Sequence, residues 1–120
     1  MKTSFAIAAL AVALLGGGHH RAHASSVAVG VAEREWGISS YRKHVPAGHV
    51  RFNVTNLGED AHNLEVVGPK GYHSPVTQDI RSGDHVTLGV TLKRAGVYRL
   101  ICTKPGHLKR GMRAVIRVTG

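Results

Sequence analysis

The chain has one cysteine, Cys102, among its 120 residues. A disulfide needs two thiols, so none forms within this chain, and zinc sites built on paired cysteines are excluded for the same reason. A lone thiol in an exported protein is a liability unless it is buried or bound. The scarcity of cysteine therefore directs attention to what surrounds Cys102.

The sequence also lacks a hydrophobic run of membrane-spanning length. The longest run, residues 5–15, has eleven apolar residues, whereas a spanning helix needs about 20. Lys2 precedes this run and "AHA" at 22–24 follows it, which is typical of a secretory signal with a small-x-small cleavage site. An amphipathic or buried N-terminal helix is the alternative, but the run has no polar face. We predict a signal peptide over residues 1–24, cleaved after Ala24. The product, residues 25–120, is then one domain without stable membrane insertion, in the periplasm or outside the cell.

Acidic residues are few. The chain has 16 Lys and Arg against 7 Asp and Glu. Loss of Lys2 and Arg21 with the signal leaves 14 against 7, a net charge of about +7. The basic residues are scattered along the predicted outward strand faces without interleaved aromatic residues, so nucleic-acid binding is not expected.

No stretch has the pattern of an amphipathic helix of three turns. Apolar residues instead alternate with polar or small ones, as in half-buried strands. Turn signals such as "PAG" at 46–48 and "RSGD" at 81–84 separate these runs. Residues 72–81 read as a loop or a short helical turn. The pattern predicts an all-β Greek-key sandwich or flattened barrel of seven to eight strands. Its inward-facing residues are predicted to include Val27, Val29, Val31, Val50, Phe52, Val54, Val86, Leu88, Val90, Leu92, Tyr98, Leu100, Ala114, Ile116 and Val118.

The segment "ICTKPGHLKRGM", residues 101–112, carries three side chains that bind metals. Cys102 is predicted to face inward at the end of one strand, and Met112 to face inward at the start of the next. His107 lies near the tip of the loop between them, so all three side chains can converge. Thiolate and thioether are soft ligands that select copper over magnesium or calcium. A copper site of this kind needs a second imidazole.

Five histidines of residues 25–120 remain as candidates for that imidazole: His44, His49, His62, His73 and His85. His62 follows the loop "NLGEDA", and it shares one predicted strand face with Leu64 and Val66. An inward position at the start of a strand matches the position of Cys102 at a strand end. We therefore select His62.

Two segments carry a family resemblance: "VPAGHVRFNVTNLGEDAHNLEVVG" and "AGVYRLICTKPGHLKRGMRAVIRV". They resemble the cupredoxins, small type 1 (blue) copper proteins, over essentially all of residues 25–120. The spacing of four between His107 and Met112 resembles the ligand loop of the rusticyanin and auracyanin type more than the shorter azurin type. Ala114 stands where the family often has glycine. The resemblance implies a copper ion with equatorial ligands His62, Cys102 and His107 and the axial ligand Met112. It also implies that Asn63 and Thr103 brace the ligand loop.

The resemblance implies a one-electron carrier rather than an enzyme, acting as a monomer between redox partners. The alternative is a copper carrier or storage protein without a role in electron transfer. Such carriers tend to expose several methionines or histidines, whereas residues 25–120 contain a single methionine, Met112. Nucleophilic catalysis by Cys102 with His107 is disfavoured by the inward thiol. Multicopper oxidases need further domains and histidines.

The ligand loop is also basic. Lys104, Lys109, Arg110 and Arg113 lie in or directly after it. These charges predict that a redox partner, such as a cytochrome or an oxidase domain, docks its acidic face around His107, where the electron would leave the protein.

Overall fold

The structure is a computed structural model that describes residues 16–18 and 25–120. The predicted signal peptide, residues 1–24, and its cleavage site lie outside these residues, apart from positions 16–18. Within the described part of the chain, no helix is long and apolar enough to cross a membrane.

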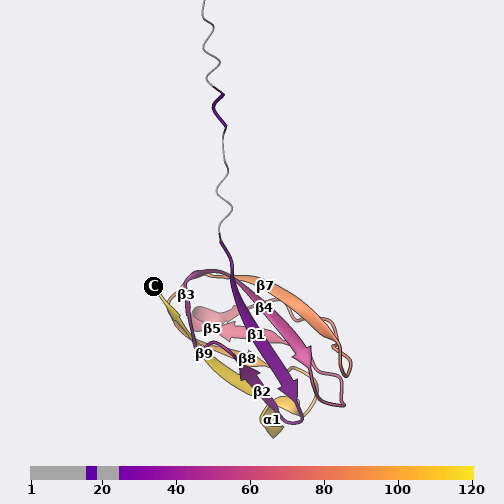
Figure 1. Cartoon of the computed structure of the whole chain (residues 1–120). Helices are drawn as coiled ribbons and strands as arrows, with labels where there is room; N and C mark the ends of the chain where they lie inside the picture. The colour runs from indigo at the N-terminus through magenta and orange to yellow at the C-terminus, as the bar shows by residue number, and fades with distance from the viewer. Residues whose placement is uncertain (1–15, 19–24) are drawn as a thin grey trace, which may run out of the picture.

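Two β-sheets face each other in a sandwich (Figure 1). The four-stranded sheet has the order β2 (Gly37–Ser40), β1 (Val27–Arg34), β4 (Gly48–Asn56) and β7 (His85–Leu92). The five-stranded sheet has the order β3 (His44–Pro46), β9 (Arg113–Thr119), β8 (Gly96–Ile101), β5 (Glu65–Gly68) and β6 (Tyr72–His73). A 3-10 turn, η1 (Pro69–Gly71), and one helical turn, α1 (His107–Arg110), complete the elements.

The chain passes repeatedly from one sheet to the other, which gives non-neighbouring strands as partners. β1 pairs in parallel with β4, and β3 in parallel with β9, while the other pairs are antiparallel. The predicted all-β sandwich is confirmed, and neither sheet closes into a barrel. The described residues form nine strands rather than seven or eight because β2, β3 and β6, of two to four residues each, are too short to show an alternating pattern.

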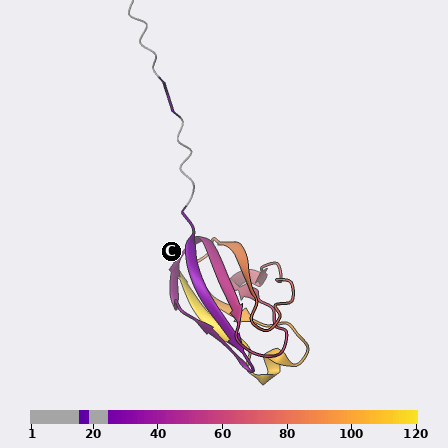
Figure 2. The same cartoon turned by 45° about the vertical axis from the view of Figure 1, so that its right-hand side comes forward.

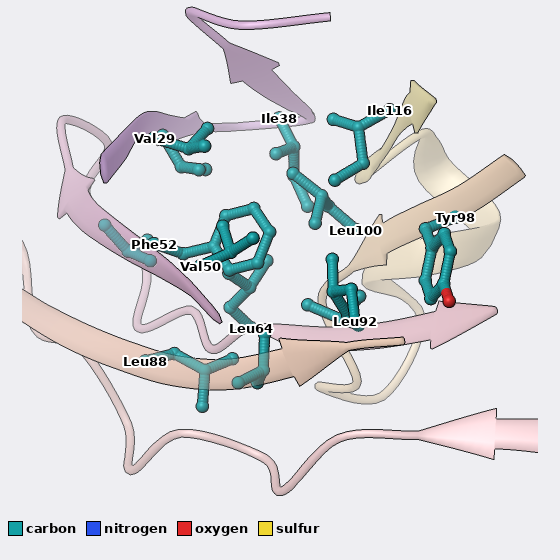
Figure 3. Packing of buried hydrophobic residues seen from close by; sticks show 14 of the residues in the cluster. Val29, Ile38, Val50, Phe52, Leu64, Leu88, Leu92, Tyr98, Leu100 and Ile116 are labelled. Carbon is teal, nitrogen blue, oxygen red and sulfur yellow. The ribbon is translucent and has the colours of Figure 1, made fainter. Parts of the chain in front are cut away.

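The core lies between the two sheets and follows the predicted alternation. Phe52 of β4 and Leu100 of β8 are fully buried and come from opposite sheets. Figure 3 shows Phe52, Leu64, Leu92 and Leu100 meeting in the space between the ribbons. Burying each such side chain stabilises the fold by roughly 1.5–3 kcal/mol before the entropy of ordering is subtracted.

One end of the sandwich gathers the segments that matter for the site. α1 lies beside the turn between β1 and β2, at the end of the molecule opposite the C-terminus (Figures 1 and 2). The loop with α1 joins β8 to β9 at this end, where Ile101 pairs with Arg113. Residues 74–81 form a loop rather than a helix. We call this end the metal end.

Candidate metal centre

Three of the predicted ligands meet at the metal end. Within residues 16–18 and 25–120, one group of histidine, cysteine or carboxylate side chains is placed to hold a metal ion: His62, Cys102 and His107, whose ligand atoms all lie within 4.8 Å of one another. Nδ1 of His62 lies 3.1 Å from Nδ1 of His107, and Sγ of Cys102 lies 3.5 Å from that same nitrogen. His62 and Cys102 are fully buried, whereas His107 is partly exposed.

The backbone explains why the loop brings its ligands together. Gly106 and Gly111 flank α1 with φ of 79° and 121°, values that side chains other than glycine rarely adopt. They let the chain turn tightly around His107. The backbone N–H of Met112 then donates to the carbonyl of His107 (3.1 Å), and the N–H of Cys102 donates to the carbonyl of Met112 (3.2 Å). Met112 is thereby held next to Cys102, with its side chain fully buried.

His62 is positioned from the other direction, through the loop before β7. It forms a two-way antiparallel bridge with Ile80, in which each backbone N–H donates to the other residue's carbonyl (3.1 and 2.7 Å). The side chains of both residues are buried, so this bridge holds the His62 imidazole inside the metal end of the sandwich.

Asn63 and Thr103 join the two ligand segments. The backbone N–H of Thr103 donates to Oδ1 of Asn63 (2.7 Å), and Nδ2 of Asn63 donates to Oγ1 of Thr103 (2.8 Å). These bonds tie the residue after His62 to the residue after Cys102 and so hold the two ligand segments together.

A residue that sequence reasoning missed also contacts His62. Oε1 of Glu35, in the turn between β1 and β2, lies 2.9 Å from Nε2 of His62. The same carboxylate accepts the backbone N–H groups of Asp60 (2.7 Å) and Glu59 (3.0 Å). These N–H groups, Asp60 first, lower the pKa of Glu35 to about 2, and the bond to His62 acts in the same direction.

The next residue, Trp36, covers the other imidazole and was also missed. Its ring packs edge-on against His107, with ring centroids 4.9 Å apart, and the guanidinium of Arg110 lies 4.5 Å from the Trp36 ring centroid. Trp36 thus shields one side of His107 and holds Arg110 beside it.

Burial shifts the pKa values of two of the converging side chains. It raises the pKa of the Cys102 thiol, with a smaller opposite effect from the backbone N–H groups of Asn63 and Lys104. It lowers the pKa of His107, and the neighbouring His62 adds to that effect. Both shifts favour the neutral side chains in the metal-free protein. A bound cation would favour the thiolate and compete with protons for the imidazoles.

Glu33 is a further unexpected feature close to this end. It is fully buried, neither carboxylate oxygen has a hydrogen-bond partner among the described residues, and burial raises its pKa to about 8. A signal for it exists in the sequence, because Glu33 has the same strand parity as the buried Val29 and Val31. No comparable signal marks Glu35 or Trp36, which lie in a turn.

The other four histidines that the structure describes lie away from this group. His44, His49, His73 and His85 are all exposed, and none belongs to the cluster of possible ligands. His73 instead pairs with Glu65 (2.7 Å) at the edge of the five-stranded sheet.

The donor set fits one type 1 copper ion. Glu35 can only accept a hydrogen bond, so Nε2 of His62 carries the proton and Nδ1 presents its lone pair to the group. Two imidazole nitrogens and one thiol sulfur then converge in a buried space. A His₂Cys set with a weak thioether is the donor set of blue copper sites, and Met112 is buried with its backbone carbonyl bonded to the N–H of Cys102.

Comparison with known proteins identifies the fold. No protein-family model and no curated protein matches the chain. Auracyanin A, a "blue" copper protein from Chloroflexus aurantiacus, superposes with a TM-score of 0.58 at 18% identity, over 79% of this chain and 100% of its own. Rusticyanin from Thiobacillus ferrooxidans superposes with a TM-score of 0.61 at 17% identity, over 81% and 79%. A multicopper oxidase superposes with a TM-score of 0.55 at 16% identity, over 78% of this chain and 41% of its own. From strand order, core and these likenesses, the chain has the cupredoxin fold.

Proposed function

We propose that the protein is an exported, mononuclear type 1 copper protein that carries single electrons between redox partners. His62, Cys102 and His107 would hold the ion, and the thioether of Met112 would be a weaker fourth ligand. The observation that carries this proposal is the convergence of one ligand atom each from His62, Cys102 and His107 within 4.8 Å in a cupredoxin fold. Copper supplies the one-electron redox chemistry when bound.

The chain's own residues support this role by being held in place. Backbone hydrogen bonds link Cys102, His107 and Met112, and the Asn63–Thr103 pair links this loop to His62. A site that rearranges little between oxidation states exchanges electrons quickly. Three of the four proposed ligands are fully buried, which suits retention of the metal. A protein that hands copper to others needs ligands that a partner can reach.

An optical spectrum of the purified protein loaded with Cu(II) tests the proposal. We expect intense visible absorption from thiolate-to-copper charge transfer, and Cys102→Ser should abolish it. His49→Ala is the control, because His49 is exposed on the outer face of β4 and lies outside the group. A colourless Cu(II) form of the intact protein would overturn the proposal.

The partner would dock at the metal end, through an acidic surface facing the basic ligand loop. His107 is the only proposed ligand that is partly exposed, so it offers the route for the electron. The structure refines which charges remain available. Lys104 pairs with Asp79 (2.7 Å), and Arg110 stacks on Trp36. Lys109 and Arg113 are exposed, and no ion pair links them to any described residue.

Salt dependence of the electron-transfer rate tests this docking. With the physiological partner, the rate should fall steeply as salt rises, because exposed charges are screened beyond about 8 Å at physiological ionic strength. Lys109→Glu should slow transfer at low salt and leave the copper spectrum unchanged. Lys93→Glu, an exposed lysine in the turn before β8 at the opposite end, is the matched control. Electron-transfer rates that change neither with salt nor with Lys109→Glu would exclude docking of the partner at this face.

A further inference from the structure

The turn between β1 and β2 reaches both imidazoles of the site. Glu35 contacts His62, and the adjacent Trp36 packs against His107. This turn precedes the ligand segments by more than 20 residues in sequence. It is brought to them because β1 lies parallel to β4, with Glu33 opposite Asn56. The end of β1 therefore lies beside the loop that leads from β4 to His62.

The Glu35 carboxylate is built into this loop by several contacts. Its Oε1 accepts from the N–H groups of Asp60 and Glu59 and faces Nε2 of His62, while Oε2 also lies 3.0 Å from the N–H of Glu59. A β-carbon at Gly58 would collide with this carboxylate, so a larger residue there would displace Glu35 from its contacts. The loop is thus shaped around an ionised carboxylate.

The chemistry of this contact decides which nitrogen of His62 carries a proton. A carboxylate accepts hydrogen bonds and donates none. Nε2 of His62 must therefore be the N–H, and in the neutral ring Nδ1 is left as the lone pair. That lone pair points at Nδ1 of His107, 3.1 Å away, in the middle of the proposed copper site.

We propose that Glu35 is a positioning residue of the copper site, which sets the tautomer and orientation of His62 and strengthens its Nδ1 as a ligand. The inference deepens the proposed function and rests on it. A carboxylate behind a ligating imidazole fixes the ring and raises its basicity. A stronger nitrogen donor favours Cu(II) over Cu(I), so Glu35 also lowers the redox potential.

Two variants separate the two contributions of Glu35. Glu35→Gln keeps an acceptor oxygen for His62 but removes the negative charge. Glu35→Ala removes both. Glu59→Gln is the matched control, because it deletes one negative charge from the same loop through an exposed side chain that does not touch His62.

The first readout uses the metal-free protein, so it does not depend on copper. Nitrogen-15 NMR of the His62 ring should show the Nε2–H tautomer in the wild type, in Glu35→Gln and in Glu59→Gln. Glu35→Ala should show a mixture of tautomers. An Nε2–H tautomer that persists unchanged in Glu35→Ala would overturn the inference, whatever copper does.

The second readout is metal affinity, measured with Co²⁺ as the probe. Trp36 is the chain's only tryptophan, and its ring lies 4.9 Å from that of His107, so its fluorescence reports occupancy. Loss of such an outer hydrogen bond weakens metal affinity by about 10- to 100-fold. We expect that loss in Glu35→Ala, little loss in Glu35→Gln, and none in Glu59→Gln. Equal Co²⁺ affinities in wild type and Glu35→Ala would overturn the inference.

The third readout is the redox potential of the copper-loaded protein, which a brace of the loop alone would not change. Glu35→Gln should have a higher potential than the wild type, and Glu59→Gln should change it less. This comparison also serves if Glu35→Ala does not fold. An unchanged potential in Glu35→Gln would overturn the electronic part of the proposal. A wild type that binds no copper, yet shows the tautomer dependence, would overturn the proposed function and leave the positioning role in place.

Discussion

The interior of the sandwich and its metal end bury side chains of opposite character. In the interior, residues such as Phe52 and Leu100 are fully buried and carry no polar group beyond a backbone already paired in the sheets. At the metal end, His62 and Asn63 are also buried, and each needs a specific partner, Glu35 and Thr103 respectively. The interior gains stability from area, whereas the metal end gains a defined geometry from hydrogen bonds.

Two carboxyl groups between the interior and the metal end show what this difference means. Glu33 and Glu35 are separated by a single residue. Glu35 accepts bonds from the loop and from His62, and its pKa falls to about 2. Glu33 is buried without a hydrogen-bond partner in the part of the chain that the structure describes, and its pKa rises to about 8. A carboxylate is stable in this region only where the surrounding N–H groups face it.

The largest expected effect comes from the interior. Phe52→Ala removes a ring buried between the sheets, which should lower the free energy of unfolding by about 3–5 kcal/mol. The folded, copper-loaded fraction should keep its visible spectrum, because the ligands lie at the metal end. Urea unfolding followed by circular dichroism measures the free energy of unfolding, and visible absorption measures the spectrum of the copper-loaded protein. If Phe52→Ala does not fold, Phe52→Leu serves in its place, and a spectrum that shifts with either change would contradict the separation of the two regions.

The next effect belongs to the metal end. His62→Ala deletes a proposed ligand, so copper affinity should fall by more than about 100-fold. That figure is the largest loss expected when only a hydrogen bond to a ligand is removed. Competition against a chelator of known affinity measures the copper affinity. His49→Ala, the exposed control, should bind as the wild type does. An affinity for His62→Ala within tenfold of the wild type would show that His62 is no ligand.

Glu33 should make stability fall as pH rises. Its folded pKa, about 8, lies above its ordinary value of 4.5, so between these values only the folded state holds the proton. Stability is full below pH 4.5 and declines by up to about 1.4 kcal/mol per pH unit towards pH 8. Between pH 5.5 and 7.5 this group should lower the free energy of unfolding by up to about 3 kcal/mol.

Glu33→Gln removes this dependence. Because His107, whose pKa is lowered, acts in the opposite direction over part of the same range, the quantity to compare is the difference between wild type and Glu33→Gln. Urea midpoints of the metal-free proteins at pH 5.5 and 7.5 provide it. Parallel changes in both proteins would contradict the burial of an unpaired Glu33 carboxyl.

The smallest effect concerns Met112. It is the proposed weak axial ligand, so Met112→Leu should keep both copper and colour and raise the redox potential, since sulfur donation to Cu(II) is lost. Leucine has a similar volume, and the free energy of unfolding should change by less than about 1.5 kcal/mol. Voltammetry of the loaded protein measures the potential. Loss of the metal in this variant would show that Met112 holds the ion rather than tuning it.

The alternation of residues was sufficient to predict the strands that build the core. The inward faces of β4, β7, β8 and β9 match the predicted ones, because each strand is long enough for one face to be buried and the other solvated. The same logic placed Cys102 and Met112 inward at neighbouring strand ends. The helical turn α1 was not predicted, because four residues between two glycines carry no periodic signal.

What the sequence by itself determined is the donor set and its approximate place: one thiol, one histidine and one methionine on a tight loop, with a second histidine near another strand. These follow from local patterns, since a strand fixes the direction of its own side chains. His62 lies three residues before β5, in an isolated bridge with Ile80, rather than at the start of a strand as predicted. Only the tertiary structure decided that Glu35 faces His62, that Trp36 covers His107 and that Glu33 is left without a partner. Those contacts arise because β1 lies parallel to β4 and carries the following turn to the metal end. The residues of the turn contain no pattern from which this pairing of distant strands could be predicted.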